Sequence, residues 1–266
     1  MGALKRTGCL WLILWALGWS VGAAAETNLP APAMTIDLAT PSVMTGTLYE
    51  IGSNPQKILY KFRRAAVREG DRIQVEQTFT LPDGSVACRE NIQYWNDQLT
   101  AYSMADVPAD LQGSIVVEPN PKNPKKERVL LEQIQGRSSG AKILNGVENL
   151  QTNLLICDTI YPFILSHWDE LMRTTVKFHL ISIDPPTTFG FKLVKERETV
   201  WRDHPVVIIK MEPSNLIIAQ LIRPIHFTIE KAAPHRVFVY TGRITPREKI
   251  NGSWKFLDAE MVLDWK

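Results

Sequence analysis

The chain has 266 residues, of which 30 are Lys or Arg, 28 are Asp or Glu, and 45% are hydrophobic. This length accommodates one large β domain or two small ones. The near-neutral charge argues against binding of bulk nucleic acid, which needs a strong basic excess.

Residues 1–25 have the three-part order of a secretory signal peptide. Two basic residues precede the apolar run Cys9–Val21, and three alanines follow. We expect cleavage after Ala25, which places the mature protein in the periplasm or outside the cell. The alternative is an uncleaved N-terminal anchor, because Gly8–Ala25 approaches the length of a bilayer span. No later segment is long and apolar enough to span, so we expect no transmembrane segment after cleavage.

Residues 26–45 are rich in Pro, Ala and Thr without a sustained period, and we expect an extended lead-in. Residues 46–266 are expected to form a single β-rich domain. Removing 25 of the 266 residues leaves 241, with 28 basic and 28 acidic side chains.

Alternating polar and apolar residues between positions 56 and 104 predict four strands of an antiparallel meander. Turn signals separate them at Glu69–Asp71, Pro82–Gly84 and Asn96–Asp97. Within the second of these strands Ile73, Val75 and Phe79 share one face and polar residues share the other. The pattern is typical of a sheet with one solvent-facing side.

The segment Val117–Val129 has three prolines among basic side chains that run from Lys122 to Arg128. No central strand accepts that composition, so we expect a solvated loop. Contact with an anionic surface is the alternative. Gln135–Gly146 then reads as another flexible connection.

Leu154–Thr174 is the longest stretch with helical character. Asp158 or Thr159 is expected to act as N-cap, and Pro162 is expected in the first turn, where its missing donor costs little. An apolar stripe at three- and four-residue steps indicates that the helix covers a sheet. Its members are Ile160, Phe163, Ile164, His167 and Leu171.

Strand patterns return from residue 175 to the end of the chain. Asn251–Gly252 is the strongest hairpin signal, because both positions tolerate the positive φ of a type I′ turn. Val206–Ile209 is apolar on both faces and must be covered on both sides. Pro213–Pro224 predicts a second short helix with Ser214 as its cap.

These elements predict a mainly β fold, a curved antiparallel sheet or half-barrel covered by two short helices. Such a sheet either fills its concave face with its own side chains or leaves an apolar cavity. Helix side chains would line that cavity, and the alternative is that they form an ordinary core. They are Leu154, Leu155, Ile160, Phe163, Ile164, Trp168, Leu216, Ile217, Ile218, Leu221 and Ile222.

Cys88 and Cys157 remain after Cys9 leaves with the leader. Two thiols in an oxidising compartment favour a disulfide, and we predict a bridge that attaches the start of the helix to the meander. Two buried, unpaired thiols are the alternative.

We identify no GxSxG nucleophile elbow, no HExxH and no GxGxxG in the sequence, and Gly136–Gly140, which fits GxSxG, is expected to be only a mobile loop. The five histidines stand at no short ligand spacing, so we expect no metal and no cofactor. We expect no catalytic residue and no enzyme activity. The enzyme alternatives are a Cys157 nucleophile with a histidine base, or acid–base chemistry by His167, Asp158 and Asp169.

Four segments carry a resemblance to a set of uncharacterised exported bacterial proteins over nearly the whole mature chain. The segments are LPDGSVACRE, DTIYPFILSHWDELM, MEPSNLIIAQLIRPIHFTIEK and VYTGRITP. That set has no established activity. More distantly, the expected architecture is similar to the half-barrel of periplasmic lipoprotein carriers and their outer-membrane receptor, although the receptor's lipid-anchor cysteine is absent. This second likeness implies an acyl-chain ligand held under helices.

We therefore expect a periplasmic, non-enzymatic binding protein for a lipid or other apolar ligand, in envelope lipid or lipoprotein handling. The alternative function is a structural or protein-interaction module of the cell envelope with a filled core. Its partners would bind exposed strands and the segment from Lys122 to Arg128.

Overall fold

The computed structural model describes residues 43–54, 56–136, 140–151, 153–220 and 222–265, so the expected signal peptide and most of the lead-in lie outside the described residues. The strands are β1 (Val43–Glu50), β2 (Ile58–Glu69), β3 (Arg72–Thr80), β4 (Val86–Trp95), β5 (Gln98–Asp106), β6 (Leu111–Asn120), β7 (Asn123–Gln135), β8 (Lys142–Asn149), β9 (Leu154–Leu155), β10 (Val176–Ile183), β11 (Pro186–Trp201), β12 (His204–Pro213), β13 (Ile225–Glu230), β14 (Val237–Ile250) and β15 (Ser253–Asp264). The helical segments are α1 (Cys157–Ser166), α2 (Trp168–Leu171) and α3 (Leu216–Ala219). No helix of this described part is long and apolar enough to cross a membrane.

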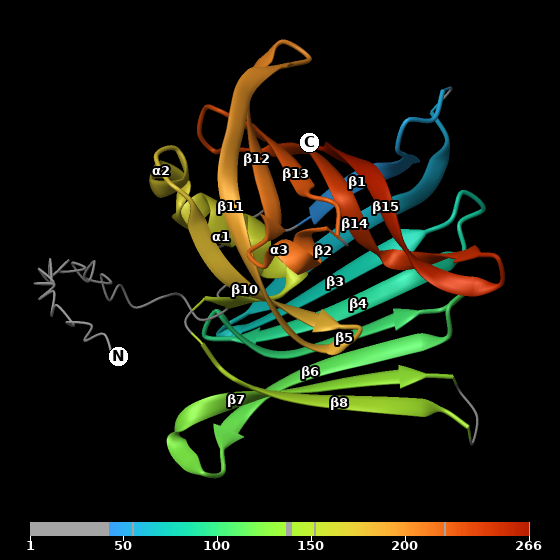
Figure 1. Cartoon of the computed structure of the whole chain (residues 1–266), viewed down its shortest axis with the longest axis vertical. Coiled ribbons are helices and arrows are strands. Elements are labelled where there is room, and N and C mark those ends of the chain that lie inside the picture. The colour runs from blue at the N-terminus through green and yellow to red at the C-terminus, as the bar shows by residue number, and fades with distance from the viewer. Residues whose placement is uncertain (1–42, 55, 137–139, 152, 221, 266) are drawn as a thin grey trace, which may run out of the picture. The chain divides into compact units, whose positions relative to one another are not determined.

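The described strands form one curved, open sheet in the order β8-β7-β6-β5-β4-β3-β2-β1-β15-β14-β13-β12-β11-β10-β9 (Figure 1). Neighbours are antiparallel except β9 and β10, which are parallel. The first strand pairs with the last, β15, and joins two wings, β1–β8 and β9–β15. The ladder does not connect β8 with β9, so the sheet does not close. The expected mainly β, curved antiparallel architecture is confirmed.

The predicted meander is present as β2 to β5, and its turns lie at the predicted signals. Gly70 and Gly84 have positive φ of 61° and 88°, which glycine adopts without a steric penalty. The last hairpin, between β14 and β15, turns at Asn251 and Gly252 with φ of 50° and 81°, as a type I′ turn requires. β1 begins at Val43, so three residues of the expected lead-in belong to the sheet.

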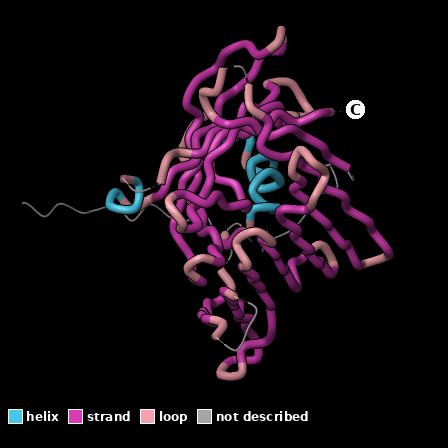
Figure 2. Tube along the Cα trace, turned by 90° about the vertical axis from the view of Figure 1, so that its right-hand side faces the viewer, coloured by secondary structure: helices cyan, strands magenta, loops and turns pink. Residues whose placement is uncertain are grey.

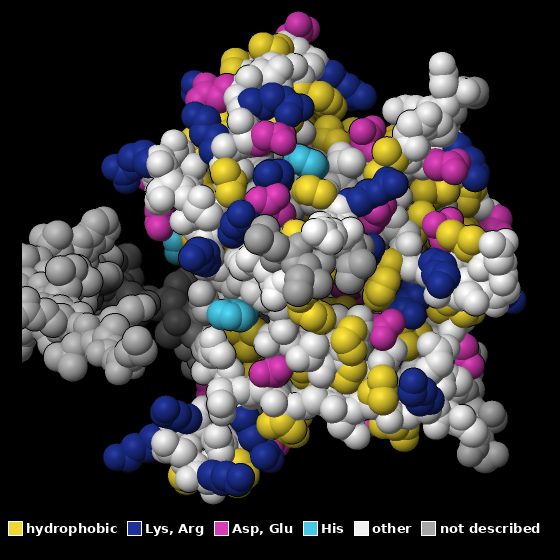
Figure 3. Space-filling view, viewed as in Figure 1, with side chains coloured by type: hydrophobic (Ala, Val, Ile, Leu, Met, Phe, Trp, Pro, Cys, Tyr) yellow, Lys and Arg dark blue, Asp and Glu magenta, His cyan; other side chains and the backbone are white. Residues whose placement is uncertain are grey.

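Two segments that we expected to be loops are strands. The basic, proline-rich segment is the outer end of the β6–β7 hairpin, where Pro119 pairs with Glu127. Residues 121–127 are exposed, so the prolines remove no buried ladder bond, and basic side chains gather over this hairpin at the lower left of Figure 3. Residues 142–149 of the second expected connection and its continuation form β8, while residues 137–139 lie outside the described part.

The turn between β10 and β11 rests on the first wing. A Cβ atom added to Gly113 of β6 would lie 2.2 Å from Cγ2 of Ile183, and one added to Gly146 of β8 would lie 2.2 Å from the Pro186 carbonyl oxygen. The Thr187 hydroxyl donates to the Glu148 carboxylate at 3.1 Å. On this side, opposite the β1–β15 ladder, the wings therefore meet through close packing and side chains and not through a strand ladder.

The concave face is filled by one continuous apolar core to which both wings and α1 contribute. Val206–Ile209 is buried on both faces, as its sequence predicts, with exposed fractions of 0 to 8%. Val206 and Phe238 form a second, smaller cluster with Trp201, whose ring stacks on Phe238.

Candidate functional site

α1 is the helix that the concave face encloses, and Figure 2 shows it among the strands. It begins at Cys157, with Ile156 as the N-cap residue. The Ile156 N–H donates to the Thr159 hydroxyl at 3.0 Å. The prediction that Asp158 or Thr159 is the N-cap is therefore wrong, because the N-cap is Ile156, two to three residues earlier.

The helix is also interrupted within the predicted stretch. His167 has φ −111° and ψ 18°, which separates α1 from α2. Pro162 is the sixth helical residue and not in the first turn. Because proline has no N–H, the Asp158 carbonyl loses its i+4 donor. Pro162 is buried, so packing compensates for this loss.

The apolar stripe of α1 is buried as predicted. Ile160, Phe163 and Ile164 are 6%, 5% and 0% exposed, and the Phe163 ring lies 5.6 Å from that of Phe178 on β10. Leu155, which we expected in the helix, is in β9 and is 2% exposed. Trp168 of α2 is half-buried, and its ring stacks on His235 with 4.0 Å between centroids.

The second helix does not share this site. α3 has four residues and packs beside β12, and it lies apart from α1 at the left edge of Figure 2. Ile218 is half-exposed and does not pack against the core, and its N–H bonds the Asn215 side chain, not the expected Ser214 cap. The Ile217 side chain and Leu221 lie outside the described part.

Asp158 is the centre of a buried polar network that joins α1 to the first wing. Arg64 Nε and Nη2 donate to Asp158 Oδ1 and Oδ2 at 2.6 and 3.1 Å. Gln77 Nε2 donates to Oδ1 at 2.6 Å, and the Tyr94 hydroxyl donates to Oδ2 at 2.8 Å. The side chains of Arg64 and Asp158 are only 2% and 1% exposed. Strands β2, β3 and β4 thus bind one carboxylate at the start of α1.

Electrostatics favour the charged form of Arg64. Burial alone lowers the Arg64 pKa. The charge of Asp158 and its hydrogen bond raise this pKa by more than burial lowers it, so the net pKa is raised. Burial and the Asp158 charge raise the Tyr94 pKa well above its usual value, so the hydroxyl stays a donor. Asp158 is therefore a hydrogen-bond acceptor in a structural ion pair, and both of its carboxylate oxygens are bound within the protein.

The predicted disulfide is absent, because Cys88 and Cys157 are both free. Cys88 is fully buried in the apolar core on β4, whereas Cys157 is exposed at the first position of α1. The start of the helix is attached to the meander as we expected, but by the ion pair of Asp158 with Arg64 and not by a covalent bond.

The residues that bind Asp158 carry a signal that the sequence does contain. Gln77 follows Ile73 and Val75 in the same alternating phase of β3, which is the buried phase. Arg64 likewise follows Phe62 on β2. A charged or amide side chain on the buried face of a strand needs a hydrogen-bond partner. The alternation of buried and exposed residues therefore identifies Gln77 and Arg64 as positions that need a partner, although it does not identify Asp158 as that partner.

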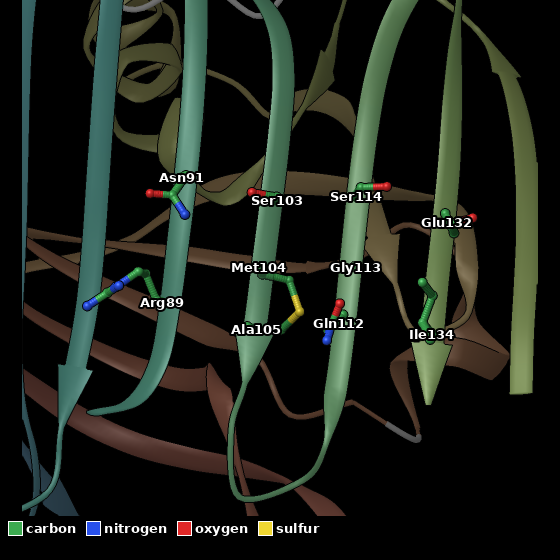
Figure 4. A pocket seen from close by; sticks show the side chains of 10 residues that line it. All are labelled: Arg89, Asn91, Ser103, Met104, Ala105, Gln112, Gly113, Ser114, Glu132 and Ile134. Atoms are coloured by element: carbon green, nitrogen blue, oxygen red, sulfur yellow. The ribbon is translucent and has the colours of Figure 1, made fainter. Parts of the chain in front are cut away.

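Two described pockets lie on the outer face of the sheet. One of about 270 Å³ crosses β4 to β7, and Figure 4 shows its mostly small or polar lining, including Asn91, Ser103 and Ser114. The other, of about 540 Å³, crosses the second wing between Trp201 and Val262. Neither is lined by α1.

The histidines make separate structural contacts. His167 Nδ1 lies 3.0 Å from the Phe163 carbonyl oxygen, and His235 Nδ1 lies 3.2 Å from that of Glu230. Within the described ranges no group of three or more His, Cys, Asp or Glu could hold a metal ion.

Comparison with known proteins gives no relative. No protein-family model, no curated protein and no solved structure matches the chain.

Proposed function

We propose that this is a non-enzymatic binding protein of the cell envelope, located in the periplasm, which takes a lipid or other apolar ligand between the concave face of its sheet and α1. Its role would be in envelope lipid or lipoprotein handling. The observation that carries the proposal is that an apolar helix lies inside a sheet whose two end strands, β8 and β9, are not joined by a backbone hydrogen-bond ladder.

The arrangement of the wings supports a concave face that can open. The β10–β11 turn rests on β6 and β8 by contacts at Gly113 and Gly146. Separating these contacts breaks no strand ladder, whereas opening a closed barrel breaks a complete row of backbone hydrogen bonds.

The chemistry of α1 supports a helix that a ligand displaces. Ile160, Phe163 and Ile164 present the concave face with a surface that an acyl chain reproduces, so exchanging one for the other conserves buried apolar area. The polar attachment at Asp158 then sets how much free energy the displacement costs. In this proposal α1 is a lid over the concave face, and the Arg64–Asp158 ion pair is the latch that holds the lid closed.

Titration with the fluorescent apolar dye N-phenyl-1-naphthylamine tests this function. If α1 must move, Asp158→Asn raises the fraction of open molecules and lowers the apparent Kd, about tenfold for each 1.4 kcal/mol removed from the latch. The matched control is Asp169→Asn, the same change at an exposed residue of α2, which should leave the Kd unchanged. Native mass spectrometry and organic extraction of protein purified from the periplasm should show a bound lipid of defined mass.

The proposal is wrong if the wild type neither carries an extractable lipid nor binds the dye. It also fails if Asp158→Asn and Asp169→Asn change the Kd equally, because the helix would then not govern access.

One observation favours the alternative function, an interaction module with a filled core. The concave face is occupied by the protein's own side chains, while β8 ends the sheet with Ile143 and Val147 53% and 61% exposed. An edge strand with exposed β-branched residues is suited to pairing with another chain. Site-specific crosslinking from position 145 in intact cells tests this, and the absence of any protein adduct would count against it.

A further inference from the structure

A second acidic group lies on the concave face, and the latch does not use it. Glu90 of β4 is 1% exposed. Its carboxyl accepts a hydrogen bond from the Thr245 hydroxyl of β14, a strand that is not its neighbour in the sheet, and the Tyr102 hydroxyl of the neighbouring strand β5 also interacts with this carboxyl. The other oxygen, Oε2, is buried and has no hydrogen-bond partner.

The surroundings of Glu90 make this unpaired oxygen unusual. Asp158 is bound by Arg64, Gln77 and Tyr94, and Asp106 accepts from the backbone N–H groups of Ala109 and Arg247. Native proteins pair most buried polar atoms, and the exceptions often mark positions that bind something else. A hydrogen-bond donor from outside the chain would satisfy Oε2.

The start of α1 lies near this carboxyl. Cys157 is exposed, although Ile156 and Asp158 on either side of it are buried. The charge of Glu90 is, after burial, the largest contribution that raises the pKa of both Cys157 and Tyr102. Glu90, Tyr102 and Cys157 therefore lie close together.

The charges around Glu90 decide which polar head group of a ligand this position accepts. Two acids, Glu90 and Asp158, act on Cys157, and the Arg64 guanidinium already pairs with Asp158. An anionic head group would add a third negative charge in a weakly screened interior, whereas a donor would pair with Oε2.

We propose that Glu90 anchors the head of the apolar ligand, and that this head is a hydrogen-bond donor, a hydroxyl or an amine, held between Glu90 Oε2 and Cys157. This inference rests on the proposed function and names the chemistry of its ligand. The chain of the ligand follows the apolar surface that α1 covers, and its head replaces the missing partner of Glu90.

Displacement of N-phenyl-1-naphthylamine by three ligands of equal chain length tests the inference. At pH 7.5, 1-dodecanol or dodecylamine should displace the dye from the wild type at a concentration about tenfold lower, or less, than dodecanoate. Glu90→Leu should abolish this preference while dye binding remains. Glu90→Gln keeps an acceptor but not a charge, so it should retain the preference for the alcohol and lose that for the amine.

Gln133→Leu is the matched control. Gln133 on β7 is also buried, 5% exposed, with an unpartnered Oε1, and it lies three strands from β4 in the sheet. Its replacement should leave the head-group preference intact.

Two results overturn the inference alone: equal displacement by all three ligands in the wild type, or an unchanged preference in Glu90→Leu. If Glu90→Leu does not fold, amine affinity in Glu90→Gln equal to that of the wild type overturns it instead. Failure of the wild type to bind the dye and every ligand overturns the proposed function, and the inference with it.

Discussion

Removing the carboxylate of Asp158 tests the structure at the point where α1 meets the sheet. In Asp158→Ala the Arg64 charge stays in place with a side chain that is 2% exposed. The Gln77 amide and the Tyr94 hydroxyl lose their acceptor at the same time. Breaking a buried ion pair by deleting one partner costs about 3–5 kcal/mol, and we expect a loss of unfolding free energy in this range.

A double-mutant cycle separates the pair from the other contacts of Asp158. Arg64→Met should also destabilise, because it leaves Asp158 buried with two neutral donors. The double variant Arg64→Met/Asp158→Ala removes both charges, so its loss should be smaller than the sum of the single losses by about 2 kcal/mol or more. The remaining loss is that of the unpaired Gln77 and Tyr94 groups.

Urea unfolding of the mature protein, followed by far-UV circular dichroism, measures these losses. Asp169→Ala is the control, because a substitution at an exposed position away from special features changes stability by no more than about 0.5 kcal/mol. If the sum of the two single-variant losses equals the loss of the double variant to within about 0.5 kcal/mol, a direct Arg64–Asp158 interaction is refuted.

Burial raises the pKa of Glu90 from 4.5 to about 7, so the native state keeps a proton that the unfolded chain releases in this interval. Stability should therefore fall by about 3 kcal/mol as the pH rises from about 4.5 to 7. Glu90→Gln should remove this dependence of the urea midpoint on pH, and equal dependences in the variant and the wild type would contradict the raised pKa of Glu90. In the folded protein a maleimide should spare the buried Cys88 and react slowly with Cys157, because desolvation of the thiol and the Glu90 charge raise the Cys157 pKa to about 12 and leave little thiolate. Peptide mapping that shows a Cys88–Cys157 bridge would refute free thiols. Gly113→Ala should cost about 1–3 kcal/mol by its clash with Ile183, and adding Ile183→Ala should recover part of this loss in thermal melts; a neutral Gly113→Ala would place the β10–β11 turn elsewhere.

The meander and the last hairpin were predictable because their signals are local. Alternation along one strand assigns each side chain to a face, and the turn at Asn251–Gly252 requires only the φ preferences of those two residues. The same alternation marks Gln77 and Arg64 as polar groups in buried phases. Composition misled at the β6–β7 hairpin, since prolines are tolerated where a strand end is exposed.

The helix was predictable in its apolar face but not in its ends. Periodicity identifies the buried Ile160 and Ile164, because it depends only on the geometry of one helix. The start at Cys157 and the break at His167 depend on contacts with strands more than sixty residues away, among them the bonds to Asp158 from β2, β3 and β4. α3 is shorter than its sequence pattern predicts, because propensity is a weak preference that tertiary packing overrides.

By itself the sequence determined the strands of the meander and of the last hairpin, the faces that their side chains present, and the apolar stripe that α1 buries, because each of these depends on a few neighbouring residues. Only the tertiary structure decided that β1 pairs with β15, that Asp158 binds Arg64 while Cys88 and Cys157 stay apart, and that Glu90 is left with an unpaired oxygen. These features join residues far apart in the chain, and no local pattern specifies which buried polar group meets which partner when a curved sheet brings its two wings together.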